Sequence, residues 1–223
     1  MIEPMDQTTP SPLDAQVTIF PNIYKAKEPH YVAVRKIFAR IKEGKSKELV
    51  EKIRACVDKK ERGELKAQLP SICFAGTFKH RDNHGIMDHA GLICLDFDHF
   101  ENNEKLFAFK ESLKKSKYVF AAFVSPSGDG MKVVVRVPKD IPNHSKYAES
   151  LSKWFKQDQW DDLKDIARVC YESWDPDIHV NEQAAVYDIL TREKPVVMEF
   201  APEGEKIVDK HTVFRNLRKW ADA

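Results

Sequence analysis

Residues 93–99 (ICLDFDH) constrain the fold most, because two aspartates alternate with apolar residues in a strand-like run. Successive side chains on a strand point to opposite faces, so Leu95 and Phe97 are expected to enter a core. Asp96 and Asp98 would then project together from the other face. At a separation of roughly 7 Å and an effective dielectric of about 20, their repulsion is about 2 kcal/mol, which a divalent cation would reverse. The pair predicts a metal site, and the alternative is a solvated acidic strand end.

Residues 125–132 (SPSGDGMK) form a small, glycine-rich segment that runs into the valine-rich residues 133–137 (VVVRV). Glycines let backbone N–H groups approach an anion closely, and strand alternation puts Lys132 on the face opposite Val133. The segment predicts a phosphate-binding turn, and the alternative is a plain hairpin turn with exposed basic residues. The nucleotide-binding residues expected here are Ser125, Ser127, Gly128, Gly130 and Lys132.

Residues 167–177 (ARVCYESWDPD) predict another short strand that ends in acid. Pro176 ends the strand pairing and keeps Asp175 extended. A lone Asp-Pro is typical of a turn. Beside the other two segments, however, Asp175 supplies the third anion of a two-cation site, in which one ion activates a hydroxyl and the other steadies a leaving pyrophosphate. Arg168 lies seven residues before Asp175 and could pair with a phosphate or a carboxylate.

These segments also carry a resemblance to a known family, together with two short runs nearer the N-terminus. The matching stretches, in chain order, are residues 17–24, 74–78, 96–98, 122–128 and 168–175. In these stretches the chain resembles the archaeo-eukaryotic primase-polymerase superfamily. It is most similar to the VirE N-terminal branch found in mobile elements, phages and CRISPR-associated primase-polymerases.

The resemblance implies a role for each segment. Asp96 and Asp98 would form the first catalytic motif, residues 127–132 the second and Asp175 the third. Lys132 stands where the wider superfamily often shows a histidine, and it could neutralise a triphosphate without titrating near pH 7. The implied cofactors are two Mg²⁺ or Mn²⁺ ions, and the implied substrates are NTPs or dNTPs on a single-stranded DNA template. A helicase or CRISPR adaptation proteins are the candidate partners.

The net charge of +1 is small, but the charges are unevenly distributed. Residues 25–66 hold 14 Lys and Arg against 7 Asp and Glu, whereas residues 158–182 hold 8 acidic residues against 2 basic ones. A basic region beside an acidic metal site suits a protein that holds a polyanion, so we expect Arg54, Lys59 and Lys60 to bind the template. The alternative is a set of solvated helix faces.

Hydrophobic periodicity predicts an α+β fold with a ferredoxin- or RRM-like palm, a mixed or antiparallel sheet and flanking helices, preceded by an N-terminal α/β part. Helices are expected near residues 31–43, 46–68, 102–116 and 143–157. Strands are expected near residues 17–20, 71–75, 91–98, 119–124, 131–137, 168–174 and 184–189. The predicted organisation is a flexible arm (1–15), an N-terminal part (16–70), the palm (71–200) and the start of a helical extension (201–223).

The composition and the cysteine pattern predict a cytoplasmic protein. The content is 42% apolar and 32% charged, and no apolar run is long enough to span a bilayer. The four cysteines show no CxxC spacing, so reduced thiols and a cytoplasmic location are expected. His80, His84 and His89 could bind zinc, but the polar string 79–85 favours a mobile loop.

The sequence therefore predicts a metal-dependent nucleotidyltransferase, a DNA primase-polymerase that makes or extends strands on a template. Two other classes of protein stay open. One is a non-catalytic nucleic-acid-binding module of a mobile-element replication protein, which would bind DNA without divalent metal. The other is a metal-dependent phosphodiesterase, which would degrade strands.

Overall fold

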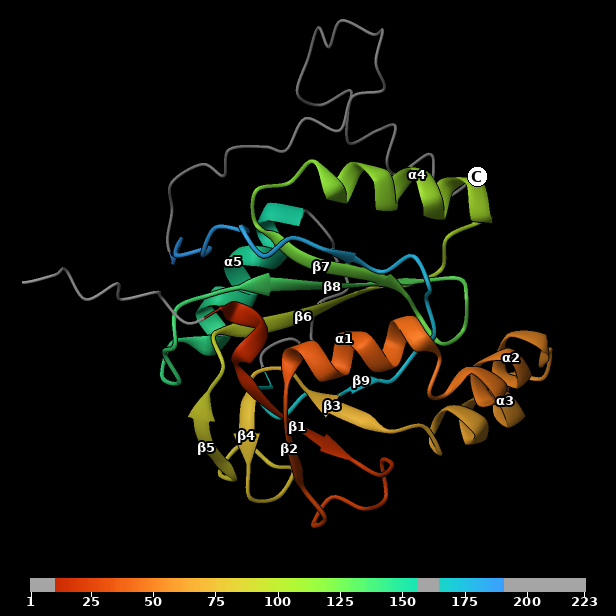
Figure 1. Cartoon of the computed structure of the whole chain (residues 1–223), viewed down its shortest axis with the longest axis horizontal. Coiled ribbons are helices and arrows are strands. Elements are labelled where there is room, and N and C mark those ends of the chain that lie inside the picture. The colour runs from red at the N-terminus through yellow and green to blue at the C-terminus, as the bar shows by residue number, and fades with distance from the viewer. Residues whose placement is uncertain (1–10, 156–164, 191–223) are drawn as a thin grey trace, which may run out of the picture.

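The computed structural model describes residues 11–155 and 165–190. Two four-stranded sheets and a two-stranded ribbon, all with antiparallel neighbouring strands, combine with five α-helices in this part of the chain (Figure 1). The predicted α+β class is confirmed. No helix among these residues is long and apolar enough to cross a membrane.

The N-terminal sheet collects strands from both ends of the described chain. In spatial order its strands are β2 (His30–Ala33), β1 (Gln16–Phe20), β3 (Ser71–Cys73) and β9 (Cys170–Tyr171). A separate ribbon pairs β4 (Gly76–Phe78) with β5 (Ile86–His89). The strand predicted over 168–174 therefore forms only as β9, and it joins this sheet instead of the palm.

The second sheet, here called the central sheet, carries the Asp96 strand. In spatial order its strands are β10 (His179–Val180), β7 (Val119–Val124), β8 (Met131–Arg136) and β6 (Leu92–Phe97). Since β8 runs antiparallel to both neighbours, β6 and β7 are parallel and are joined through α4 (Asn103–Lys114). This is the split βαβ arrangement that the sequence predicts.

The last strand of the central sheet differs from a ferredoxin-like sheet. There the fourth strand lies beside the first, whereas here β10 pairs with β7. The strand expected over 184–189 does not form, because this segment makes isolated backbone hydrogen bonds and no ladder with a neighbouring strand. Ala185 N bonds to Lys117 O at 2.7 Å, and Tyr187 N bonds to Arg136 O at 2.7 Å. One edge of the sheet, along β6, is left without a partner strand among the described residues.

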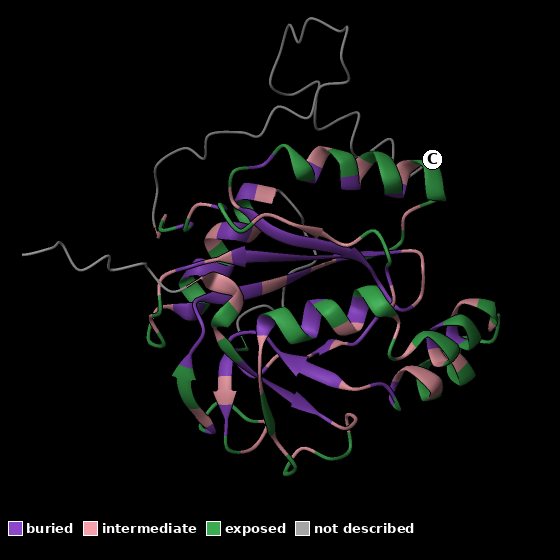
Figure 2. Cartoon of the chain, in the orientation of Figure 1, coloured by how far each residue is buried: buried purple, intermediate pink, exposed green. Residues whose placement is uncertain are grey.

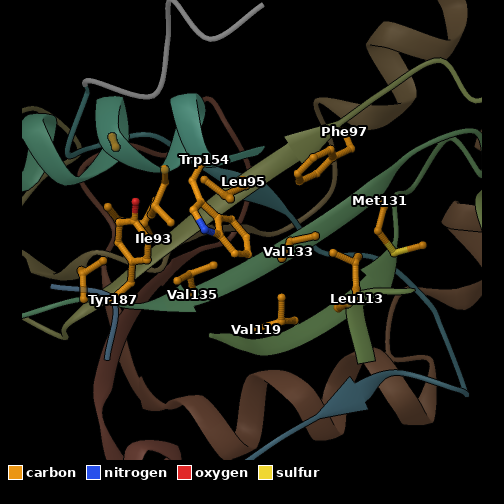
Figure 3. Packing of buried hydrophobic residues seen from close by; sticks show 14 of the residues in the cluster. Ile93, Leu95, Phe97, Leu113, Val119, Met131, Val133, Val135, Trp154 and Tyr187 are labelled. Carbon is orange, nitrogen blue, oxygen red and sulfur yellow. The ribbon is translucent and has the colours of Figure 1, made fainter. Parts of the chain in front are cut away.

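One hydrophobic core lies between the central sheet and two helices, α4 and α5 (His144–Phe155). Ile93, Leu95 and Phe97 point into it from alternate positions of β6 (Figure 3). Trp154 and Tyr187 close the same core. The prediction that Leu95 and Phe97 are buried is confirmed, since both are at most 1% exposed.

A second core lies on the other face of the central sheet, around α1 (Val34–Glu43). The helix buries a stripe of Val34, Ile37, Phe38 and Ile41 at helical spacing. This stripe packs with side chains of both the N-terminal and the central sheet, so α1 joins the two (Figures 1 and 2).

The basic segment after α1 forms two helices where the sequence predicted one. These are α2 (Lys47–Ala55) and α3 (Lys59–Lys66). The break occurs at Asp58, whose side chain accepts a hydrogen bond from Glu61 N at 2.7 Å. An aspartate in this position is a typical N-cap, so it starts a new helix.

The ends of the predicted domains also need correction. Residues 11–15, assigned to a loose arm, hold a short 3₁₀ turn, Pro12–Asp14, and Leu13 packs against the core around α1. The boundary at 70/71 divides the N-terminal sheet, because β3 lies on one side of it and β1 on the other. The helical extension over 201–223 lies outside the described residues.

Candidate active site

The two aspartates of the central sheet lie at the end of β6, as predicted. Asp96 faces away from the Leu95 side of the strand and is partly buried, whereas Asp98 is exposed just beyond it. The chain turns sharply at His99, which has a left-handed φ of 65°. Partial desolvation raises the pKa of Asp98, and repulsion from Asp96 raises it further. The carboxylates are therefore close enough to repel each other.

Asp96 is paired with two cations. Lys132 lies directly across from it on β8, and its Nζ forms an ion pair with Asp96 Oδ2. Arg168 NH2 is 3.8 Å from the same oxygen. Burial of Lys132 lowers its pKa, but the Asp96 carboxylate together with Cys170 and Cys94 more than offsets this, so the net pKa is raised. Lys132 therefore stays charged, and Asp96 Oδ1 is buried without a hydrogen-bond partner among the described residues.

The predicted glycine-rich turn packs against Asp98. A Cβ on Gly130 would lie 2.7 Å from Asp98 Oδ1, 2.8 Å from Phe97 O and 3.0 Å from Ser125 Oγ. Gly128 has a φ of 85°, which favours glycine. Ser125 is 1% exposed, and its Oγ has no hydrogen-bond partner in the part of the chain that the structure describes. The turn thus presents polar atoms beside the carboxylate pair, and Ser127 lies half-buried within it.

Arg54, expected on a template-binding surface, lies instead behind this turn. Its NH2 donates to Ser125 O at 3.2 Å and to Trp174 O at 2.9 Å. Burial lowers its pKa. Arg54, at the end of α2, therefore holds the turn in place. In this it differs from Lys59 and Lys60, the two residues predicted with it to bind the template. Lys59 and Lys60 are exposed at the start of α3.

Lys66, at the end of α3, is a site residue that the sequence analysis did not single out. Burial lowers its pKa, while Asp129 and Asp98 raise it and Lys132 lowers it further. These three electrostatic neighbours place the Lys66 ammonium near the carboxylate pair and the turn. The sequence signal was weak, because Lys66 is one of many lysines in a basic segment.

The structure does not bring Asp175 to Asp96 and Asp98. Asp175 is 5% exposed, and its Oδ2 accepts from Lys110 Nζ at 2.7 Å and from Val124 N at 2.8 Å. Its Oδ1 accepts from Asp177 N at 3.0 Å. Oδ2 therefore fixes the end of β7 against α4, and Oδ1 holds the turn that follows Asp175.

A cleft runs beside Asp96 along the free edge of β6. Its interior volume is about 20 Å³, which is enough for a water molecule, and its mouth is open to solvent. Asp96, Lys132 and Arg168 line it together with apolar side chains such as Phe74 and Leu92. Asp96 thus lines this cleft, and Asp98, two residues further on, lies against the glycine-rich turn.

The three histidines considered for zinc are not gathered at one place. His89 is buried, and its Nε2 lies 2.9 Å from His144 Nδ1. His80 pairs with Asp82 at 2.7 Å instead. Within residues 11–155 and 165–190, no group of three His, Cys, Asp or Glu side chains is arranged to hold a metal ion.

The donors present at the site do fit a divalent cation bound by two carboxylates. The unpartnered Oδ1 of Asp96 and the repulsion that raises the pKa of Asp98 are both relieved by a cation. Carboxylate oxygens are the ligands that Mg²⁺ and Mn²⁺ prefer, and Mg²⁺ usually completes its shell with water and substrate phosphates.

Comparison with known families matches residues 64–179 to the family described as BT4734-like, N-terminal domain. The match spans just over half of the 223 residues, and it includes the carboxylate pair, the glycine-rich turn and Arg168. Neither the curated proteins nor the solved structures contain a match. The chain therefore belongs to the family of BT4734-like N-terminal domains.

Proposed function

We propose that this protein is a metal-dependent nucleotidyltransferase that joins nucleotides on a single-stranded nucleic-acid template. The observation that carries the proposal is the placement of Asp96 and Asp98 against the Ser125–Gly130 turn. A carboxylate pair that fits a divalent cation lies beside backbone that can approach a phosphate, which is the pairing needed to bind a metal-nucleotide complex.

The surrounding charges support a polyphosphate ligand. Lys132 and Arg168 both pair with Asp96, and the ammonium of Lys66 adds a third positive charge near Asp98 and the turn, so a bound polyphosphate would meet three cations. Asp96 and Asp98 would hold the cation, which would supply charge neutralisation for the phosphates.

Asp175 is left out of the proposed metal site, because its two oxygens are engaged by Lys110, Val124 and Asp177. The proposed roles of Ser125, Ser127 and Gly128 are to shape and line the phosphate-binding turn. Arg54 acts behind the turn as a positioning residue. The four cysteines are free thiols, in keeping with our proposal of a cytoplasmic protein.

The test is incubation with a single-stranded template, labelled nucleotides and Mn²⁺, followed by length-resolved analysis of products. The wild type should yield extended strands, and Asp98→Asn should yield none while losing Mn²⁺ binding measured by calorimetry. Shortened strands would point to a phosphodiesterase. Metal-independent DNA binding with no product would point to a non-catalytic binding module, and either result would overturn the proposal.

A matched pair of glycine variants separates the turn from general stability. Gly130→Ala places a methyl group against Asp98 and Phe97 O, so incorporation should fall steeply. Gly63→Ala, on the exposed side of α3, meets nothing within 4 Å and should leave incorporation unchanged. Equal activity of the two variants would remove the turn from the site.

A further inference from the structure

A group of aromatic and basic side chains lies on β2 and on the β1–β2 and β4–β5 loops, outside the site described above. We call it the tyrosine surface, and it consists of the exposed Tyr24, Lys27 and Tyr31 and the partly buried Arg81. Tyr24 is 75% exposed and Tyr31 is 47% exposed. Single exposed aromatic residues are common, but aromatic rings interleaved with cations are the pattern that proteins use for single-stranded nucleic acid.

The loop that carries Tyr24 is held in a defined position. Tyr24 N donates to Asn22 Oδ1 at 3.0 Å, which forms an Asx turn. Ile23 N bonds to Ala67 O at 3.4 Å, and Arg81 N bonds to Ala26 O at 2.9 Å. The ring is therefore exposed on a loop tied both to the end of α3 and to the β4–β5 loop.

Tyr31 is also fixed in orientation. It pairs with Thr18 across β1 and β2, and its hydroxyl donates to Phe78 O at 3.2 Å. The β1–β2 loop and the β4–β5 loop lie at the same end of the molecule, and α4 lies at the opposite end (Figure 1). Preorganised rings lose little conformational entropy when a base stacks on them.

The tyrosine surface connects to the proposed active site through contacts on α3 and β9. Ala67 O accepts the hydrogen bond from Ile23 N, and the residue before it, Lys66, has a pKa that burial lowers and the charge of Asp98 raises. Tyr171, half-buried on β9, has Arg81, Tyr24 and Lys132 as electrostatic neighbours. Both connections lead from the exposed loop to the carboxylate pair.

We propose that the tyrosine surface binds single-stranded nucleic acid, with bases stacked on Tyr24 and Tyr31 and the backbone drawn by Lys27 and Arg81. The tyrosine surface would hold the nucleic-acid strand whose end reaches Asp98. This part of the proposal rests on the proposed function of the carboxylate site. Stacking requires unpaired bases, so the surface should prefer a single strand to a duplex of the same charge.

The test uses the full chain and a fluorescein-labelled oligothymidylate, without nucleotide or divalent metal. Tyr24→Ala should weaken binding by about five- to 150-fold, the range for loss of one stacked base. Tyr24→Trp should restore it. Phe107→Ala, which removes an exposed aromatic ring from α4, is the matched control and should bind as the wild type.

Two further ligands separate stacking from charge. Duplex DNA and polyphosphate should bind more weakly than the single strand, and Tyr24→Ala should change their affinities little. Lys27→Gln should lower the slope of log affinity against log salt by about 0.7. Equal losses for all three ligands, or a Tyr24→Ala/Tyr31→Ala variant within about twofold of the wild type on the single strand, would overturn the proposal.

Failure of the tyrosine-surface proposal can be told apart from failure of the nucleotidyltransferase proposal. Mn²⁺-nucleotide binding is measured on the same variants, and Tyr24→Ala should leave it unchanged because Tyr24 is outside that site. Strand binding that is independent of Tyr24, with nucleotide binding intact, removes only the tyrosine surface. Tyr24-dependent strand binding without any nucleotide binding removes only the nucleotidyltransferase.

Discussion

At the scale of single residues, the two aspartates of β6 are in different electrostatic states. Asp96 is compensated by Lys132 across the strand pair and by Arg168, whereas Asp98 has its pKa raised by desolvation and by Asp96. Asp98 is therefore the carboxylate whose charge destabilises the protein when no cation is bound.

We expect Asp98→Asn to raise the melting temperature of the metal-free protein at pH 7. The folded-state pKa of Asp98 is above the ordinary value of 3.8, so the folded protein binds more protons than the unfolded chain at pH values between the two pKa values. Stability is therefore lost as the pH rises through this range, and Asn, which does not titrate, removes the loss. Thermal melts at pH 7 and at a pH below 3.8 should show the difference at pH 7 alone.

Asp88→Asn is the control for this prediction, since Asp88 is an exposed carboxylate on β5. It should not reproduce the gain at pH 7. A wild type that is as stable as Asp98→Asn at neutral pH would mean that the two carboxylates do not repel each other appreciably.

The second prediction at this scale concerns the buried histidine pair. Gly91 N donates to His89 Nδ1 at 2.9 Å, so His89 Nε2 carries the proton and donates to His144 Nδ1. Burial, and then the charge of His89, lower the pKa of His144 from 6.5 to about 4. The unfolded chain thus binds more protons between these values, and stability should fall by about 3 kcal/mol as the pH drops from 7 to 4.

Urea denaturation at several pH values would check this dependence. His144→Asn keeps an acceptor oxygen for His89 but has no titrating ring, so its stability should vary less across the window. An identical pH dependence in the variant would assign the acid sensitivity to other groups.

At the scale of elements, the crossing from β9 to β10 depends on two buried carboxylates. Glu172 is fully buried, and it accepts from Arg40 NH2 at 3.1 Å and from Ser46. Asp175 pairs with Lys110 of α4. These charges tie one short segment to α1 and to α4, which gives a structural role to Asp175, the carboxylate that sequence analysis assigned to a metal site.

We expect Asp175→Asn to destabilise the protein by about 3–5 kcal/mol, because it leaves the buried Lys110 ammonium without its carboxylate. The double variant Lys110→Met/Asp175→Asn removes both charges and should recover part of that loss. Urea midpoints measure both effects. If Asp175→Asn were as stable as the wild type but inactive, Asp175 would have a catalytic role after all.

The elements that sequence reasoning found are those with a strong local signal. Strand β7 has the bounds predicted for residues 119–124, because six buried apolar residues follow one another. Strand β2 was missed, since His30 and Tyr31 are exposed and merge into the helical pattern of α1. Strand β9 is the two-residue remainder of the strand predicted over 168–174, whereas β10 was not predicted, because tertiary pairing alone defines it.

The same distinction applies to the candidate site. The positions of Asp96, Gly130 and Lys132 followed from strand alternation and turn chemistry, which are local. The partners of Asp175 and Arg54 lie 65 and 71 residues away along the chain, so no spacing rule could assign them. The sequence alone therefore could not show that Asp175 and Arg54 are engaged in structural contacts and are not free to bind metal or template.

At the scale of the whole molecule, the two sheets share one core, and the site lies where they meet. Helix α1 packs against both, and β9 and β10 are consecutive strands that belong to different sheets. Asp96 and Lys132 come from the central sheet, whereas Arg168 precedes β9 of the N-terminal sheet. The site is thus assembled only when both sheets are in place.

The last prediction follows from this shared core. A fragment of residues 71–223, which corresponds to the predicted palm and extension, lacks α1 and β1. It would expose Phe120, Phe123 and Val134 of the central sheet, all fully buried in the whole chain. We expect this fragment to show no cooperative thermal transition by circular dichroism, and adding a peptide of residues 1–70 should restore one. A sharp transition in the fragment alone would show that the central sheet folds independently and that α1 only covers it.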